Sequence, residues 1–178
     1  KCPQIPRDAY SLMFDPVRIC EILNEECVDY VVVGGFAAVI RGSSLPTRDI
    51  DIVPSRIPEN LDRLARALTR MNAEIRISGD SVSTRIDGAF LANMPFMLNL
   101  VTDFGEMDLT FSPAGIAGGY DGWRVGATEE TVSEGLTVVV ASLDDIIDSK
   151  RTANRAKDQV ALPYLESLRD EIRRQSGE

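Results

Sequence analysis

The 178-residue chain contains no histidine. This absence excludes Ser-His-Asp triads, Cys-His dyads and zinc or iron held by imidazole. Any metal must therefore be held by oxygen atoms, which favours Mg²⁺ or Mn²⁺. General base chemistry falls to carboxylates or to the metal itself.

Long apolar runs and paired cysteines are missing as well. No apolar run reaches the roughly 18 residues of a membrane-spanning helix, and Lys1-Cys2-Pro3-Gln4 lacks the apolar core of a signal peptide. The three cysteines, Cys2, Cys20 and Cys27, form no metal-type pair. We therefore expect reduced thiols in a cytoplasmic protein that has no membrane partner.

The charge balance is acidic, with a formal net charge of −9, and lysine occurs only at positions 1, 150 and 157. A negative net charge argues against broad, non-specific nucleic-acid binding but allows a local basic groove. The length is sufficient for one domain with its own core. We expect a single domain over 1–178, with a core at about 28–141 and a helical part at about 142–178.

Hydrophobic periodicity and turn residues predict an alternation of helices and strands. Helices are expected at 15–27, 36–41, 58–71, 142–152 and 157–174, and strands at 28–33, 48–53, 73–77, 83–86, 95–101, 106–111, 123–125 and 136–140. The glycine-rich segment 113–122 is expected to be a loop, and Val160, Leu162 and Leu165 are expected to face inward. These elements predict an α/β (α+β) fold, with a mixed central β-sheet flanked by helices.

The most informative segment is 31–53. An apolar strand leads into Gly34-Gly35 and a short helix, and a polar loop then leads to Asp49-Ile50-Asp51-Ile52. Strand alternation puts Asp49 and Asp51 on one face, where two carboxylates repel unless a cation lies between them. Glycines before a helix offer backbone N–H groups to a phosphate. The segment predicts a metal–nucleotide site, with tightly packed glycines and solvated aspartates as the simpler alternatives.

A third carboxylate lies further along the chain. Asp108 shares one face of the strand 106–111 with Glu106 and Thr110. If this strand lies beside that of Asp49 and Asp51, three carboxylates converge and can hold two divalent ions about 3.5–4 Å apart. Taken alone, Asp108 fits an ordinary surface position better than a metal site.

A cationic cluster follows in the segment 149–158. Lys150 or Lys157 can reach a triphosphate as a point charge, and an arginine can bind phosphate through two N–H groups. A charged helical turn is commonly just a solvated face. Lysine is so scarce in this chain, however, that the cluster indicates a binding role.

These motifs together resemble the hG[GS]…DhDh signature of the polymerase-beta-type nucleotidyltransferase superfamily. Val33-Gly34-Gly35 and Asp49-Ile50-Asp51-Ile52 fit it, with 13 residues between Gly35 and Asp49 and no serine after the glycines. Looser segments over about 28–165 resemble the compact AbiE-type and MenT-type toxin branch. They are Thr102-x-x-Gly105-x-x-Asp108-Leu109, Pro113-x-Gly115, Gly119-Tyr120-Asp121, Ser142-Leu143-x-Asp145-Ile146-Ile147-x-Ser149-Lys150-Arg151 and Arg155-x-Lys157-Asp158.

The resemblance implies a metal-dependent nucleotidyltransferase of nucleotidyltransferase-like fold. It implies that Asp49 and Asp51 hold two Mg²⁺ (or Mn²⁺) ions and that Asp108 holds the ion that activates the acceptor hydroxyl, or accepts its proton. The catalytic residues are then Asp49, Asp51, Asp108 and Lys150. The nucleotide-binding residues are Gly34, Gly35, Arg48, Lys150, Arg155, Lys157 and Asp158, with Asp158 orienting Lys150 or Arg155.

The toxin branch implies an NTP substrate, the 3′ end of tRNA as acceptor, and a cognate antitoxin protein as partner. A tRNA acceptor needs a positive surface. The residues available to supply it are Arg41, Arg48, Lys150, Arg151, Arg155 and Lys157. By the same resemblance, Ser43 or Ser44 in the loop before the aspartates is a candidate for control by phosphorylation.

Two other functions stay open. One is nucleotidyl transfer to a small molecule such as an aminoglycoside, which an acidic surface suits better than it suits tRNA. The other is an inactive nucleotide-binding interaction module, which the three intact aspartates disfavour.

Overall fold

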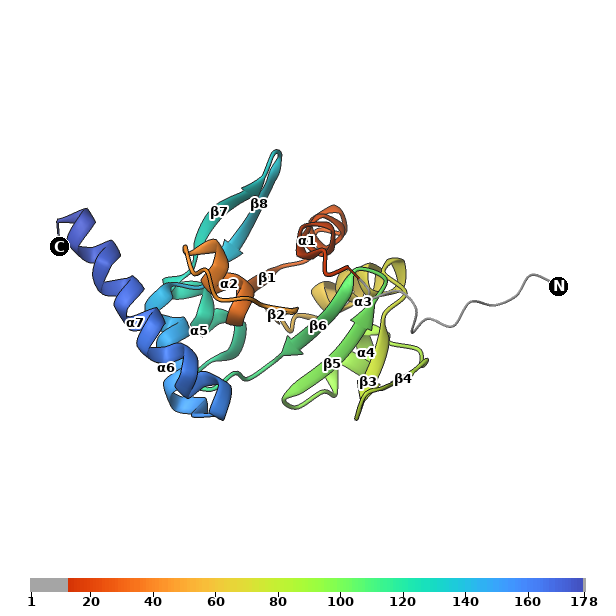
Figure 1. Cartoon of the computed structure of the whole chain (residues 1–178). Helices are drawn as coiled ribbons and strands as arrows, with labels where there is room; N and C mark the ends of the chain where they lie inside the picture. The colour runs from red at the N-terminus through yellow and green to blue at the C-terminus, as the bar shows by residue number, and fades with distance from the viewer. Residues whose placement is uncertain (1–12, 178) are drawn as a thin grey trace.

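The computed structural model describes residues 13–177, so Cys2 and the segment 1–4 lie outside it. One mixed 8-stranded sheet runs in the order β4-β3-β5-β6-β2-β1-β8-β7. Helices lie to either side of these strands (Figure 1). The predicted α/β (α+β) fold, a mixed central sheet flanked by helices, is confirmed.

The bounds of the elements are as follows. The strands are β1 (Tyr30–Val33), β2 (Asp49–Pro54), β3 (Glu74–Ile77), β4 (Asp80–Val82), β5 (Met97–Thr102), β6 (Gly105–Thr110), β7 (Thr128–Ser133) and β8 (Leu136–Val140). The helices are α1 (Pro16–Glu25), α2 (Gly34–Ile40), α3 (Pro58–Arg70), α4 (Gly88–Ala92), α5 (Gly119–Gly126), α6 (Leu143–Ala153) and α7 (Ala156–Ser176). Among the described residues, no helix is both long and apolar enough to cross a membrane.

The three strands β1, β2 and β6 form the middle of the sheet. β2 pairs antiparallel with β1 and parallel with β6. Alternation along β2 sends Ile50 and Ile52 into the core, where neither is exposed, and turns Asp49 and Asp51 to the other face. The hydrophobic effect on one face of β2 therefore fixes the direction in which its carboxylates point.

Two helices begin at the capping residues that the sequence predicts. Asp15 accepts the N–H of Arg18 at the start of α1, and Ser142 accepts the N–H of Asp145 at 3.0 Å at the start of α6. In α3 the predicted inward face is buried, including Leu61, Leu64 and Leu68. The helices α6 and α7 pack side by side, next to α2 (Figure 1).

The segment 113–126 differs from its prediction. We expected a loop at 113–122 and a strand at 123–125, but 119–126 forms the helix α5. A Cβ at Gly122 would lie 1.8 Å from the carbonyl oxygen of Ala117, so this glycine allows close packing rather than a turn. The prediction was wrong because glycine signals both features, and the short apolar run 123–125 suits either a strand or a helix.

Three smaller predictions were also wrong. No strand forms at 83–86, and the strand β4 lies just before it, at Asp80–Val82. Ser78 and Gly79 both adopt positive φ and form the turn that pairs β4 with β3. β7 was missed because its polar sequence pairs only at the sheet edge, with β8. Val160 is 81% exposed rather than inward, because α7 buries the face that carries Asp158 and Leu165.

Candidate active site

The sheet register brings the acidic residues together. β2 and β6 are parallel neighbours in which Asp51 lies opposite Asp108 and Asp49 lies opposite Glu106. Opposite residues in a ladder share a face. The adjacency on which the predicted carboxylate site depended is therefore confirmed, and Asp108 is a buried residue rather than a surface one.

Asp51 is the central acid of this group. Burial, followed by the negative charges of Asp49 and Asp108, raises the pKa of its carboxyl to about 7, against the opposing effect of Lys157 and Lys150. A cation next to this carboxyl would stabilise its charged form. The chemistry of the site therefore favours a bound cation next to Asp51.

The predicted glycine pair lies against this acid. Gly34 has a φ of +67°, and a Cβ there would lie 2.1 Å from Oδ2 of Asp51. A Cβ on Gly35 would lie 2.8 Å from Oγ1 of Thr47. The glycines thus let the start of α2 approach the acidic strand, which is a packing role that the sequence left open as an alternative to phosphate binding.

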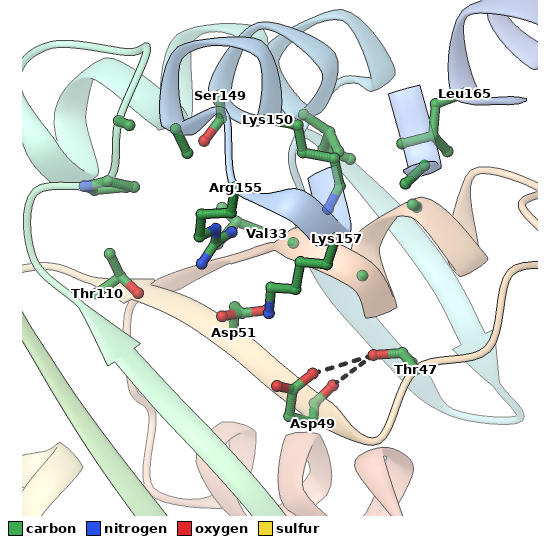
Figure 2. A pocket seen from close by; sticks show the side chains of 18 of the residues that line it. Val33, Thr47, Asp49, Asp51, Thr110, Ser149, Lys150, Arg155, Lys157 and Leu165 are labelled. Carbon is green, nitrogen blue, oxygen red and sulfur yellow. Dashed lines mark hydrogen bonds between the residues drawn. The ribbon is translucent and has the colours of Figure 1, made fainter. Parts of the chain in front are cut away.

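Thr47 orients Asp49. Its Oγ1 donates to the backbone oxygen of Asp49 at 3.1 Å and lies 3.2 Å from the Oδ1 of the same residue (Figure 2). Sequence reasoning placed Thr47 in the loop but gave it no role. The two-residue spacing from Asp49, typical of a local side-chain turn, was the available signal.

Arg76 of β3 contacts the other edge of the acidic group. Its guanidinium lies 2.9 Å from Glu106 and 3.3 Å from Asp108. Burial raises the pKa of Asp108 although Arg76 lowers it. Sequence reasoning missed Arg76, because β3 is separated from β6 by β5 and no local pattern links them.

The predicted cationic cluster is built around a buried acid. Asp158 is 0% exposed, lying 2.7 Å from Nε of Arg155 and 3.3 Å from Nζ of Lys150. Burial acts to raise the pKa of Asp158, but the hydrogen bond from Arg155 and the charges of Lys150 and Arg155 leave it below its usual value. Asp158 therefore contacts both cations, of which the resemblance implied that it orients Lys150 or Arg155.

Lys157 and Arg48 complete the set of predicted cations. Both are exposed, and neither forms an ion pair within the described part of the chain. Figure 2 shows the Lys157 side chain extending toward Asp51, between the acidic strand and the helix pair. In contrast, Arg41 pairs with Glu130, and Arg151 pairs with Asp148 and Glu166.

One cavity of about 560 Å³ joins these groups. It is lined by Gly34, Gly35, Arg48, Asp49, Asp51, Lys150, Arg155 and Lys157, and also by Trp123, which sequence reasoning had placed in a strand. Asp108 and the buried Asp158 lie behind this lining rather than in it. Of the two loop serines, Ser43 is buried, while the hydroxyl of Ser44 lies 2.9 Å from that of Tyr164.

The acids fit an oxygen-bound divalent cation of the Mg²⁺ or Mn²⁺ type. Asp51 supplies a half-buried carboxylate with no cationic hydrogen-bond partner among residues 13–177, and Asp49 supplies a second on the same face. Among residues 13–177, no group of three or more Asp, Glu or Cys side chains is arranged to hold a metal ion. The third predicted ligand, Asp108, is turned toward Arg76 and must leave it to join the other two.

We compared the chain with protein-family models, curated proteins and solved structures. No family model matches the chain, and no curated protein matches it. The solved structure of the lincosamide antibiotic adenylyltransferase LnuA, with lincomycin bound, is similar over 86% of this chain and 95% of its own, at 16% identity and a TM-score of 0.57. A nucleotidyltransferase candidate from Thermotoga maritima, TM1012, aligns over 91% of this chain and 96% of its own, at 17% identity and a TM-score of 0.46. The likeness to LnuA shows that this chain has the fold of a nucleotidyltransferase.

Proposed function

We propose that this protein is a metal-dependent nucleotidyltransferase that moves a nucleoside monophosphate from an NTP to a hydroxyl group of a small acceptor molecule. The observation that carries the proposal is one cavity with carboxylates of β2 on one wall and lysines of α6 and α7 on another. Acids suit a cation, and lysines suit a triphosphate. A site with both wall types fits a metal–NTP complex.

The acidic residues would bind the metal, and the basic residues would bind the phosphates. Asp49, Asp51 and Asp108 would hold Mg²⁺ (or Mn²⁺), which when bound supplies positive charge to the triphosphate and lowers the pKa of the acceptor hydroxyl. Lys150, Lys157 and Arg155 would bind the phosphates, together with Arg48 and the backbone of Gly34 and Gly35.

The transfer itself follows from this division. The acceptor oxygen bonds to the α-phosphorus, the bond from that phosphorus to the bridging oxygen breaks, and pyrophosphate leaves. Asp108 lies opposite Asp51 in the sheet, and once released from Arg76 it would accept the hydroxyl proton. Positioning and charge stabilisation supply most of the rate.

A small acceptor is favoured over tRNA by the charges on the surface. Four of the six cations that a tRNA surface would use, Arg41, Lys150, Arg151 and Arg155, already form ion pairs with acids. The net charge of −9 opposes a polyanion but suits a neutral or cationic molecule. The neighbour LnuA is named for a lincosamide antibiotic, which makes lincomycin the first acceptor to test.

Transfer to the 3′ end of tRNA, as the toxin of a toxin–antitoxin pair, is the second candidate. It is favoured by Arg48 and Lys157, which are exposed cations lining the cavity without an ion-pair partner among residues 13–177. Control by phosphorylation would then act more readily at the exposed Ser44 than at the buried Ser43.

Label transfer tests the proposal. The protein is incubated with each α-³²P-labelled NTP and Mg²⁺ in the presence of lincomycin, an aminoglycoside or total tRNA. We expect label on a small acceptor, and a loss of roughly a thousandfold or more in Asp51→Asn, because one metal ligand is removed. Label on tRNA alone would favour the second candidate. If no acceptor is labelled and the wild-type protein does not bind nucleotide, nucleotidyl transfer is contradicted.

A further inference from the structure

Trp123 carries an unpaired hydrogen-bond donor at the cavity. The side chain is 1% exposed, lines the cavity, and its Nε1–H has no hydrogen-bond partner among the described residues. Leaving such a donor unpaired in a buried position destabilises the protein. Two buried arginine nitrogens share this condition, but Arg63 and Arg76 use other N–H groups and do not line the cavity. Trp123 has no second donor, so an acceptor on a bound ligand or a water molecule would satisfy this N–H group.

Uncharged residues line the cavity together with Trp123. Thr110 and Ser149 offer hydroxyl groups, and Ala114 and Ile146 are apolar lining residues. Thr110 follows Asp108 by two residues on β6, so it lies past the acids along the strand direction. Figure 2 shows Thr110 on the opposite side of Asp51 from Thr47, with Ser149 above it. We call Trp123, Thr110 and Ser149 the inner subsite.

We infer that the inner subsite binds the nucleobase of the NTP, with Nε1–H of Trp123 donating to a ring nitrogen or carbonyl oxygen of the base. The inference rests on the proposed nucleotidyl transfer. A base is flat and apolar on its faces but carries hydrogen-bond acceptors on its edge. Phosphates carry charge that the lysines of the cavity match and a neutral indole does not.

The chain provides its own reporter for this contact. Trp123 is the single tryptophan in the sequence, so its fluorescence reports on the inner subsite alone. We expect at least one of the four NTPs, with Mg²⁺ and without acceptor, to quench or shift the emission in a saturable way. Inorganic tripolyphosphate should give little change. Equal changes with tripolyphosphate and NTP would overturn the inference.

Calorimetry separates the hydrogen bond from the packing of the ring. Trp123→Phe keeps an aromatic ring without the N–H, and we expect about tenfold weaker NTP binding with unchanged tripolyphosphate binding, as one hydrogen bond predicts. Tyr120→Phe is the matched control, because it removes a polar group from the same helix but does not line the cavity. It should bind NTP like the wild type.

A ligand-side change keeps the test independent of folding. Purine analogues in which a ring nitrogen is replaced by carbon should bind the wild type more weakly, and the same analogue should lose little further in Trp123→Phe. If Trp123→Phe does not fold, the wild type alone decides the test. An analogue that binds the wild type more weakly and no longer quenches its fluorescence supports the contact. Unchanged binding of every analogue contradicts it.

The outcomes distinguish this inference from the proposed function. If the wild type binds no NTP, both fail. If it binds and transfers nucleotide but Trp123→Phe has the wild-type Kd, the nucleobase contact alone is wrong. If Trp123→Phe weakens lincomycin and not NTP, the inner subsite belongs to the acceptor and the inference is overturned.

Discussion

Gly34 at the start of α2 and Asp51 in the middle of β2 are in such close contact that a Cβ on Gly34 would lie 2.1 Å from Oδ2 of Asp51. The backbone φ of +67° at Gly34 adds a second reason for glycine. We expect Gly34→Ala to displace the Asp51 carboxylate. Because about one charged contact is lost, the affinity for NTP and for Mg²⁺ should fall by about tenfold or more. The protein should also be destabilised by about 2 kcal/mol.

Gly42→Ala is the matched control for this prediction. Gly42 also has a positive φ, of +104°, but a Cβ there meets nothing within 4 Å. This variant should show the cost of backbone strain, about 1 kcal/mol, with normal ligand binding. Calorimetry and thermal melting measure both effects. Equal ligand affinities in the two variants would show that the contact with Asp51 has no role in binding.

The raised pKa of Asp51 predicts how stability depends on pH without metal. The folded protein holds the Asp51 proton up to about pH 7, whereas the unfolded chain loses it near the ordinary value of 3.8. Between these values the folded state binds more protons, so the free energy of unfolding falls as pH rises, and the loss is complete above about pH 7.

Asp51→Asn should remove this part of the pH dependence. We expect the variant to be more stable than the wild type at pH 8 in EDTA by roughly 2–4 kcal/mol, since one pKa unit corresponds to about 1.36 kcal/mol. Urea unfolding from pH 5 to pH 8 measures it, with Asp121→Asn on the exposed side of α5 as control. Parallel pH profiles for wild type and Asp51→Asn would contradict the prediction.

Asp158 should act on the nucleotide through Lys150 and Arg155. It is fully buried and contacts both cations. Asp158→Asn keeps the shape but loses the charge, so we expect a severalfold to tenfold rise in KM for NTP and a loss of about 2–3 kcal/mol of stability. Steady-state kinetics and melting check this. Glu166→Gln, which removes the exposed ion pair with Arg151, should leave KM for NTP within twofold of wild type.

Arg76 should compete with metal for Asp108. Its guanidinium lies 3.3 Å from the Asp108 carboxylate. Because Arg76→Gln frees that carboxylate, we expect Mn²⁺ to bind several times more tightly, while the metal-free protein becomes less stable through repulsion among the acids. Mn²⁺ titration followed by calorimetry measures the first effect. Arg85→Gln, at an exposed ion pair with Asp87, is the control. Weaker Mn²⁺ binding in Arg76→Gln would instead indicate that Arg76 supports the site.

Local sequence patterns were sufficient to predict several features of this protein. Alternation in Asp49-Ile50-Asp51-Ile52 fixed which side of β2 is acidic, because burial of the isoleucines leaves the aspartates only one face. Ser142 and Asp15 predicted helix starts, because a capping side chain acts within three residues. The absence of histidine excludes imidazole as a metal ligand.

Contacts between residues that are distant in the sequence could not be predicted, because they depend on how the elements pack. The pairing of Asp51 with Asp108 depends on strand order, and the contact of Arg76 with Asp108 reaches across an intervening strand. Trp123 enters the cavity because 119–126 packs as a helix, although its short apolar run suits a strand equally well. Periodicity describes the faces of one element, whereas the composition of the site depends on how separate elements pack, which local sequence does not encode.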